Sequence, residues 1–417
     1  MLKKLCNRKA KCALYALLLL AAVIYSLLFS GFTGLTAESM RLLGRIRTAM
    51  NAGIYLLAFL CAVMELFQSW PRALLSVLLL ALRWRSPLSW QMGMLLDTVL
   101  LALLSDLGTE KTNGYTWLAA HVVYIPLLFA MLRLGWVNES FMEGRKGFWI
   151  FQTGHSYGMS HPNNFAVLFM STWMALWVLF LPKRGWIAAL FFWVGAFMMY
   201  AMTLCRTAAV LMAVFPVLYM LLEAIGRSKH PGLLRAAAAA PLLAAAVTVA
   251  LGLMISTFRK LFPDGAFWLR FSELRLLEKD GLTLFGAVPT EFAYFDNFYL
   301  WLPMYCGLIP TVGVLAVYSY MIYGLARDGR IALLAVAALF VGYGLMENAV
   351  AYAVYFFVPL LAFANSEGRE KILHERSNKI IKLCVRICDP QRSHSRRDPG
   401  NPLLFHLQFH RRPDRWL

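Results

Sequence analysis

The chain of 417 residues is 60% hydrophobic and only 15% charged, and its mean hydropathy is +0.60. Soluble domains carry about 25% charged residues, so this composition excludes an ordinary soluble protein and indicates a polytopic membrane protein. The net charge of +18 does not indicate nucleic-acid binding, because the basic residues form short clusters between apolar runs and do not cover one soluble face. We expect membrane lipids, and no nucleic acid, among the partners.

The apolar runs predict an all-α fold of about twelve membrane-spanning helices, since a helix needs about 20 apolar residues to cross a bilayer. The first run follows a basic N-terminus and is predicted to be a retained signal anchor. The run at residues 72–82 is short enough to be a re-entrant segment. The expected spans are residues 12–32, 49–67, 72–82, 88–104, 115–136, 161–181, 186–204, 207–225, 233–256, 307–326, 331–346 and 349–364.

Charge fixes the expected topology of these spans. With the N-terminus in the cytoplasm, the short basic loops between spans and the basic C-terminus fall inside, as the positive-inside rule requires. The two longest polar connections, residues 137–160 and 257–297, then face outward together. Residues 1–365 are expected to form the membrane domain, and residues 366–417 a basic, cytoplasmic and partly disordered tail.

Three arginines, Arg41, Arg45 and Arg47, disagree with this rule, because the predicted topology places them outside. Two interpretations remain open: an amphipathic interfacial helix whose arginines touch lipid headgroups, or a site for a phosphate-bearing substrate.

Ionisable residues inside predicted spans are costly and therefore mark candidate functional positions. Most of them lie near span ends, and Glu347 is expected at the outer turn of the last helical hairpin. Asp97 and His121 lie deeper, and they are expected to pair across two helices or to relay protons. The whole set is Glu65, Asp97, His121, Arg133, Glu223 and Glu347.

The first long outer loop ends in GHSYGMSHPNNFA, residues 154–166. Upstream, Arg145 and Lys146 supply positive charge, and His161-Pro162 is suited to start a helix whose amides favour anions. A neutral histidine also accepts a proton near pH 7. The alternative is that His161 only forms hydrogen bonds at the membrane interface.

Further arginines fall on the same predicted side. Arg206 lies at a turn between two spans, where it binds an anion or simply extends to the interface. The second outer loop carries Arg270 and Arg275 among aromatic residues. Guanidinium groups suit phosphate and aromatic faces suit sugar rings, so these loops favour a lipid-diphosphate sugar donor.

Four segments resemble, in order, the motifs of bacterial polysaccharide polymerases of the O-antigen polymerase and ligase superfamily. HSYGMSHPNNF resembles the Ser-x-Gly-Phe-x-His-Pro-Asn loop-to-helix motif, and CRTAAVL resembles a Ser-Arg-Thr turn with Cys205 in place of serine. Arg270 followed by LTLFG, and then FDNFYLWLPMYCGLIP, resembles the later Arg, Leu-Phe-Gly and Asp-Asn-x-Tyr-Leu motifs. Many members carry a basic residue just before the first motif, whereas this chain has Gly154.

The resemblance implies a metal-independent, inverting glycosyltransferase with a fold like that of GT-C enzymes and no cofactor. It would polymerise undecaprenyl-diphosphate-linked oligosaccharide repeat units into a cell-surface polysaccharide, such as a capsule or exopolysaccharide. The reaction would take place on the outer face of the bacterial cytoplasmic membrane, with both termini cytoplasmic. A flippase and a chain-length regulator protein are the expected protein partners.

Each candidate site residue receives a role on this basis. His161, Arg206 and Arg270 are the expected catalytic residues, with His161 as base or acceptor-orienting group and the arginines on the diphosphate. For Asp296 and Asn297, a helix cap is an alternative to substrate binding. The expected substrate-binding residues are Arg145, Lys146, Asn163, Arg275, Asp296 and Asn297.

Two other functions fit the same sequence. A ligase of the superfamily would hand finished glycan to another acceptor, and the sequence does not separate it from a polymerase. A lipid-linked sugar flippase or other transporter would carry charged residues along its spans, whereas here the arginines gather in the outward loops.

Overall fold

The computed structural model describes ten ranges of the chain, which are residues 8–29, 35–66, 69–85, 90–143, 153–181, 184–227, 231–254, 281–286, 297–347 and 357–364. They belong to one compact unit that ends at Asn365. The predicted tail, residues 366–417, lies outside the described residues.

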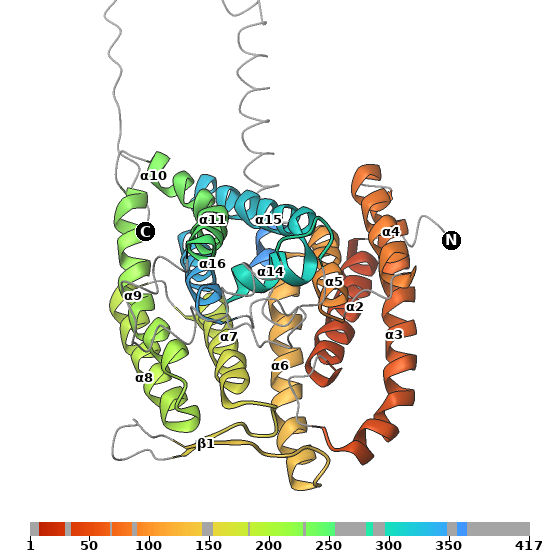
Figure 1. Cartoon of the computed structure of the whole chain (residues 1–417). Coiled ribbons are helices and arrows are strands. Elements are labelled where there is room, and N and C mark those ends of the chain that lie inside the picture. Colours follow the sequence, from red (N-terminus) through yellow and green to blue (C-terminus); the bar gives the residue numbers. More distant parts are fainter. Residues whose placement is uncertain are drawn as a thin grey trace, which may run out of the picture. The chain divides into compact units, whose positions relative to one another are not determined.

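The described part of the chain is almost entirely helical (Figure 1). Its elements in chain order are α2 Arg8–Phe29, α3 Ala37–Leu66, α4 Trp70–Arg85, α5 Trp90–Leu104, η1 Ser105–Leu107, α6 Glu110–Arg133, β1 Phe141–Glu143, β2 Thr153–His155, α7 Pro162–Phe180, α8 Gly185–Thr203, α9 Arg206–Arg227, α10 Pro231–Ala236, η2 Ala237–Ala239, α11 Ala240–Leu253, α14 Phe298–Cys306, α15 Leu308–Arg327, α16 Ile331–Gly344 and α17 Phe357–Ala362.

Eight helical segments of the described chain are long and apolar enough to cross a membrane. They lie in α2, α3, α6, α7, α8, α9, the continuous stretch from α10 to α11, and α15. The prediction of an all-α polytopic membrane protein is therefore confirmed. Three of the other predicted spans fall on α4, α5 and α16, which have 16, 15 and 14 residues and are shorter than a bilayer core requires. The last predicted span, residues 349–364, lies partly outside the described residues, which include its end as α17. The count of twelve stays a prediction.

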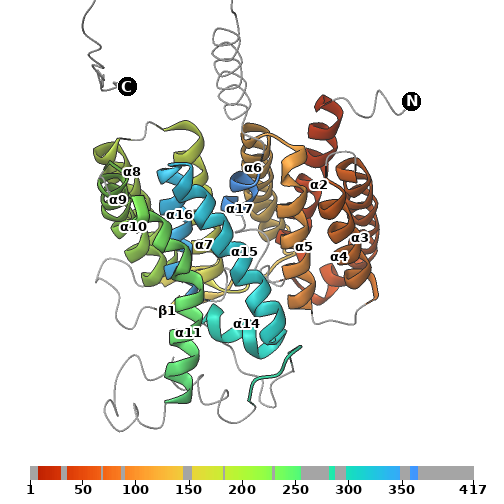
Figure 2. The same cartoon turned by 90° about the horizontal axis from the view of Figure 1, so that it is seen from above.

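Helices that follow one another in the chain pack side by side (Figures 1 and 2). The first helices form one group, in which α2 contacts α3 and α6, and α3 contacts α4. In a second group α8 contacts both α7 and α9, and α16 packs against α9. Trp177 of α7 anchors this group, because its buried ring meets the rings of Phe192, Phe215 and Tyr219 edge-on at centroid distances of 5.0–5.6 Å.

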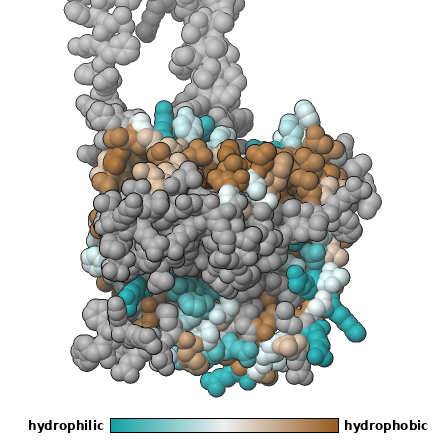
Figure 3. All heavy atoms as spheres, in the orientation of Figure 1, coloured by the Kyte–Doolittle hydropathy of each residue, from teal (hydrophilic) through white to brown (hydrophobic). Residues whose placement is uncertain are grey.

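One end of the bundle carries the antiparallel pair of β1 and β2, and we call it the hairpin end (Figure 1). The connection from α2 to α3 joins it there, since the Thr36 amide donates to the Trp136 carbonyl at 3.1 Å and Leu35 bridges Val137. In the view of Figure 3, hydrophilic residues gather at this end and hydrophobic residues lie along the helices away from it. The start of α3, with its arginines, thus lies at the same end as the first predicted outer loop.

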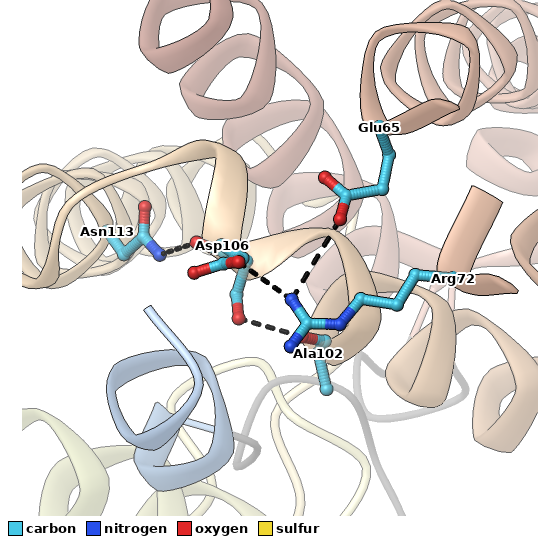
Figure 4. A network of polar contacts seen from close by, with 6 residues as sticks. Glu65, Arg72, Ala102, Asp106 and Asn113 are labelled. Atoms are coloured by element: carbon cyan, nitrogen blue, oxygen red, sulfur yellow. Dashed lines mark hydrogen bonds and ion pairs between the residues drawn. The ribbon is translucent and has the colours of Figure 1, made fainter. Parts of the chain in front are cut away.

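The opposite end is held by a polar network around Arg72 of α4 (Figure 4). Its Nη1 donates to Asp106 Oδ2 at 2.7 Å and lies 3.8 Å from Glu65 Oε1. Beside it, Asn113 Nδ2 donates to the carbonyls of Ser105 at 2.9 Å and Leu360 at 3.3 Å. Arg72 thus joins the start of α4 to the end of α3 and to η1, and α4 packs against α3.

The predicted pairing of Asp97 with His121 is wrong. Asp97 Oδ1 instead lies 3.4 Å from Arg83 Nε. The imidazole of His121 stacks on Trp117 at 3.6 Å, and its Nδ1 donates to the Trp117 carbonyl at 2.9 Å. The rotation of α5 and α6 about their axes points the two side chains to different neighbours.

Candidate functional site

The segment between β2 and α7 is a tight turn with a fixed conformation. Tyr157 and Gly158 both have positive φ, at 51° and 89°, which is costly for a tyrosine and natural for a glycine. The turn is fastened to the strand before β1, where Ser140 N–H donates to Ser156 Oγ at 2.9 Å and Ser140 Oγ donates to the Ser160 carbonyl at 3.0 Å. Its position relative to α7 is therefore well defined.

Aromatic contacts support this turn from the membrane side. The ring of Tyr157 lies 4.6 Å from that of Phe165 and 5.6 Å from that of Phe129. Burial, together with the nearby Glu139 carboxylate, raises the pKa of Tyr157 above its ordinary value. The phenol consequently stays protonated at neutral pH and is available as a hydrogen-bond donor.

His161 is the N-cap of α7, and Pro162 occupies the first helical position. Its Nδ1 accepts a hydrogen bond from the Asn163 amide at 3.1 Å. An amide N–H can only donate, so Nδ1 carries no proton, and the neutral imidazole must carry its proton on Nε2. In this arrangement Nε2 is a donor, which favours orienting or stabilising an oxygen over taking a proton from it.

A buried carboxylate lies beside this helix start. Asn163 Nδ2 donates to Glu347 Oε1 at 3.4 Å, although the two residues are 184 positions apart. Glu347 follows α16 and is only 7% exposed, and its backbone amide donates to the Tyr343 carbonyl at 2.9 Å. A negative charge at the N-terminus of α7 is favoured by the helix dipole.

The start of α14 converges on the same point. Asn297 is the N-cap of α14, since its Oδ1 accepts from the amides of Tyr299 at 2.8 Å and Leu300 at 3.1 Å. Its Nδ2 donates to the Leu345 carbonyl at 3.1 Å. The alternative role of Asn297 as a helix cap is thus confirmed, while its substrate contact stays a prediction.

The turn between α8 and α9 contacts strand β2 at the hairpin end. Arg206 is the first residue of α9 and is exposed. Strand β2 packs on the turn so closely that a Cβ added to Gly154 would lie 2.7 Å from the Thr203 carbonyl carbon and nearer still to its oxygen. The missing basic side chain at Gly154 therefore has a physical reason, because no side chain fits there.

The LTLFG segment has a packing role in the described residues. The carbonyls of Thr283 and Leu284 accept from the amides of Leu308 and Ile309 at 2.9 and 3.1 Å, so the segment caps the start of α15. Gly286 and Gly307 both have positive φ, and their backbones are in direct contact.

The structure describes four of the nine predicted site residues and places them on segments that contact α16 or the hairpin. These are His161, Asn163, Arg206 and Asn297. The remaining predictions, at Arg145, Lys146, Arg270, Arg275 and Asp296, lie outside the described residues.

The sequence interpretation missed two acidic partners. Glu347 was expected at an outer turn but was assigned no role. His155 Nδ1 lies 3.0 Å from Glu139 Oε1, and this pair links β2 to the segment that precedes β1. An isolated acid between two apolar runs, as in LMENAV, is the signal that pointed to Glu347.

The geometry defines a helical, multi-span membrane protein with a polar site at its hairpin end. This chain matches no family model, no curated protein and no solved structure. In the part of the chain that the structure describes, no group of three or more His, Cys, Asp and Glu side chains is placed to hold a metal ion.

Proposed function

We propose that this protein is a glycosyltransferase of the bacterial cytoplasmic membrane that polymerises undecaprenyl-diphosphate-linked oligosaccharide repeat units at its hairpin end, on the outer face. The observation that carries the proposal is the contact between Asn163 and Glu347. It joins a capped helix start bearing His161 to a buried acid, and the Arg206 turn packs against β2 of the same loop. Together with the sequence resemblance, this supports a site for transfer from a diphosphate.

The reaction needs three functions, which these residues supply. A hydroxyl of the acceptor sugar attacks the anomeric carbon of the donor, the bond to the diphosphate oxygen breaks, and the hydroxyl proton leaves. Glu347, the carboxylate that accepts from Asn163, takes that proton, and the Nε2–H of His161 orients the acceptor oxygen. Arg206, joined by the predicted Arg270, stabilises the negative charge that develops on the undecaprenyl diphosphate leaving group.

A purified, full-length protein tests the activity. In detergent with lipid-linked repeat units, we expect a ladder of products that differ by one repeat. Transfer of finished glycan only to a different acceptor would mean a ligase, and lipid-linked sugar moved across proteoliposomes without chain growth would mean a transporter. Either result contradicts polymerisation.

Variants of the two central residues test the assigned roles. We expect Glu347→Gln to lower the turnover by about 10²-fold or more, because a positioned general base contributes 10²–10⁴-fold. His161→Asn keeps the cap of α7 while removing the imidazole, whereas His161→Ala removes both. Both His161 variants should lose activity, and only His161→Ala should unfold at lower temperature, at a cost of about 1 kcal/mol.

The role assignment would be contradicted by full-length polymer from both His161→Ala and Arg270→Ala. Normal turnover by Glu347→Gln would show that Glu347 is not the general base and that another group takes the proton of the acceptor hydroxyl.

A further inference from the structure

Helix α3 is longer than a membrane requires. It runs for 30 residues, and the 20 residues from Arg47 to Leu66 already span about 30 Å at 1.5 Å per residue, the thickness of a bilayer core. Its first turns therefore continue beyond the hydrocarbon at the hairpin end. Arg41 and Arg45 lie in these turns, roughly 3–9 Å further along the axis than Arg47.

The same face of α3 changes from apolar to cationic as it leaves the hydrocarbon. Within the membrane this face exposes large apolar side chains, which are Leu56, Phe59, Leu60 and Val63, each 39–60% exposed. At about 100° per residue, Arg41 and Arg45 lie roughly 40° apart and on this same face. Both arginines are exposed, so they continue the lipid-facing stripe at headgroup depth.

Arg41 and Arg45 carry charges that no described carboxylate neutralises. Among the residues whose side chains the structure describes, no carboxylate forms an ion pair with Arg41 or Arg45. Arg47 differs, since it lies on another side of the helix and its Nε donates to Tyr25 Oη at 3.4 Å. Two like charges one helical turn apart repel each other, and a shared anion would remove that repulsion.

We propose that Arg41 and Arg45 form a binding site for the phosphate of an anionic phospholipid in the leaflet at the hairpin end. Side chains at i and i+4 are neighbours on a helix, and two guanidinium groups can donate bidentate hydrogen bonds to one phosphate. Leu42 and Ile46, which are also exposed, lie beside them on the same turns of α3. An anionic lipid is preferred because a zwitterionic one brings its own cation. This site does not depend on the proposed glycosyl transfer.

Native mass spectrometry of the full-length protein in detergent, titrated with phosphatidylglycerol or phosphatidylcholine, tests the site. We expect one phosphatidylglycerol to bind more tightly than the others. Arg41→Gln/Arg45→Gln should weaken its binding about 30-fold, because each interfacial arginine contributes about fivefold. The matched control, Lys111→Gln/Arg235→Gln, removes the same charge from exposed positions at the other end and should leave this binding unchanged.

Three results would overturn the proposal. The first is equal binding of phosphatidylglycerol by the wild type and the Arg41/Arg45 variant. The second is an equal loss in the control variant, which would mean that net charge alone attracts the lipid. The third is displacement of phosphatidylglycerol by equimolar farnesyl diphosphate in the wild type but not in the variant, which would make the site one for a prenyl diphosphate.

Discussion

Gly154 shows how a single residue fixes the position of the loop that carries His161. One of its two α-hydrogens stands where a side chain would begin, and there β2 passes over the backbone of the turn between α8 and α9. A methyl group at this position must move either the hairpin or the turn, because the atoms it meets belong to the backbone. We expect Gly154→Ala to lower the free energy of unfolding by about 2 kcal/mol, as overpacked positions do, measured by thermal unfolding in detergent.

A matched glycine provides the control for this experiment. Gly53 lies within α3 and has open space around an added Cβ, so Gly53→Ala should leave stability unchanged or raise it by up to about 1 kcal/mol. A wild-type melting temperature for Gly154→Ala would show that the hairpin does not rest on this turn.

Glu347 and His161 illustrate what a sequence can say about one residue. The Pro at the first helical position and the polar residue before it predicted a helix start at His161, and the structure has it there. Which ring nitrogen of His161 carries the proton depends on the direction of the Asn163 N–H, which only the folded chain defines. The sequence shows Glu347 as an isolated acid, but it does not show that Asn163 is its hydrogen-bond partner.

At the scale of the elements, the network around Arg72 ties α3, α4 and η1 together (Figure 4). Glu65 is fully buried, and Arg72 is its cation at 3.8 Å. We expect Arg72→Gln to destabilise the protein by about 2 kcal/mol, because it leaves a buried carboxylate without a partner. This is below the 3–5 kcal/mol of a fully buried pair, since the Arg72 side chain is 46% exposed. Thermal unfolding in detergent measures it.

A second substitution separates the ion pair from general packing. Adding Glu65→Gln to Arg72→Gln removes the unpaired charge and should restore most of the lost stability, while Glu65→Gln alone should have a smaller effect than Arg72→Gln. A double variant that is as unstable as the sum of the two single variants would mean that the charges do not interact.

Two of the predicted spans correspond to short helices. Predicted spans at residues 72–82 and 88–104 fall on α4 and α5, which have 16 and 15 residues. Hydropathy counts residues but does not reveal how deeply a short helix sits between its neighbours. The contacts of α4 with α3 and α5 supply that information.

At the scale of the whole molecule, the two ends of the bundle make the topology testable. We expect single cysteines at Arg41 and Asn138, at the hairpin end, to react with a membrane-impermeant thiol reagent in intact cells. Cysteines at Lys111 and Arg235, at the other end, should react only after permeabilisation. The background replaces the seven native cysteines.

The pattern of labelling distinguishes the possible errors. Different results for Arg41 and Asn138 would contradict their position at one end. If Lys111 and Arg235 react in intact cells and the other two positions do not, the grouping of positions at two ends is still correct. The candidate site would then lie in the cytoplasm, which contradicts the proposed reaction on the outer face.

The sequence by itself determined that this is a helical membrane protein, where most helices begin and end, and that polar residues gather in loops. These properties follow from local composition, because a bilayer selects apolar runs of a given length. Only the tertiary structure decided which side chains meet: Asn163 with Glu347, Gly154 with the turn at Thr203, and Asp97 with Arg83. Helices that are apolar on nearly every side carry little signal for their rotation, so packing alone decides which polar groups face each other.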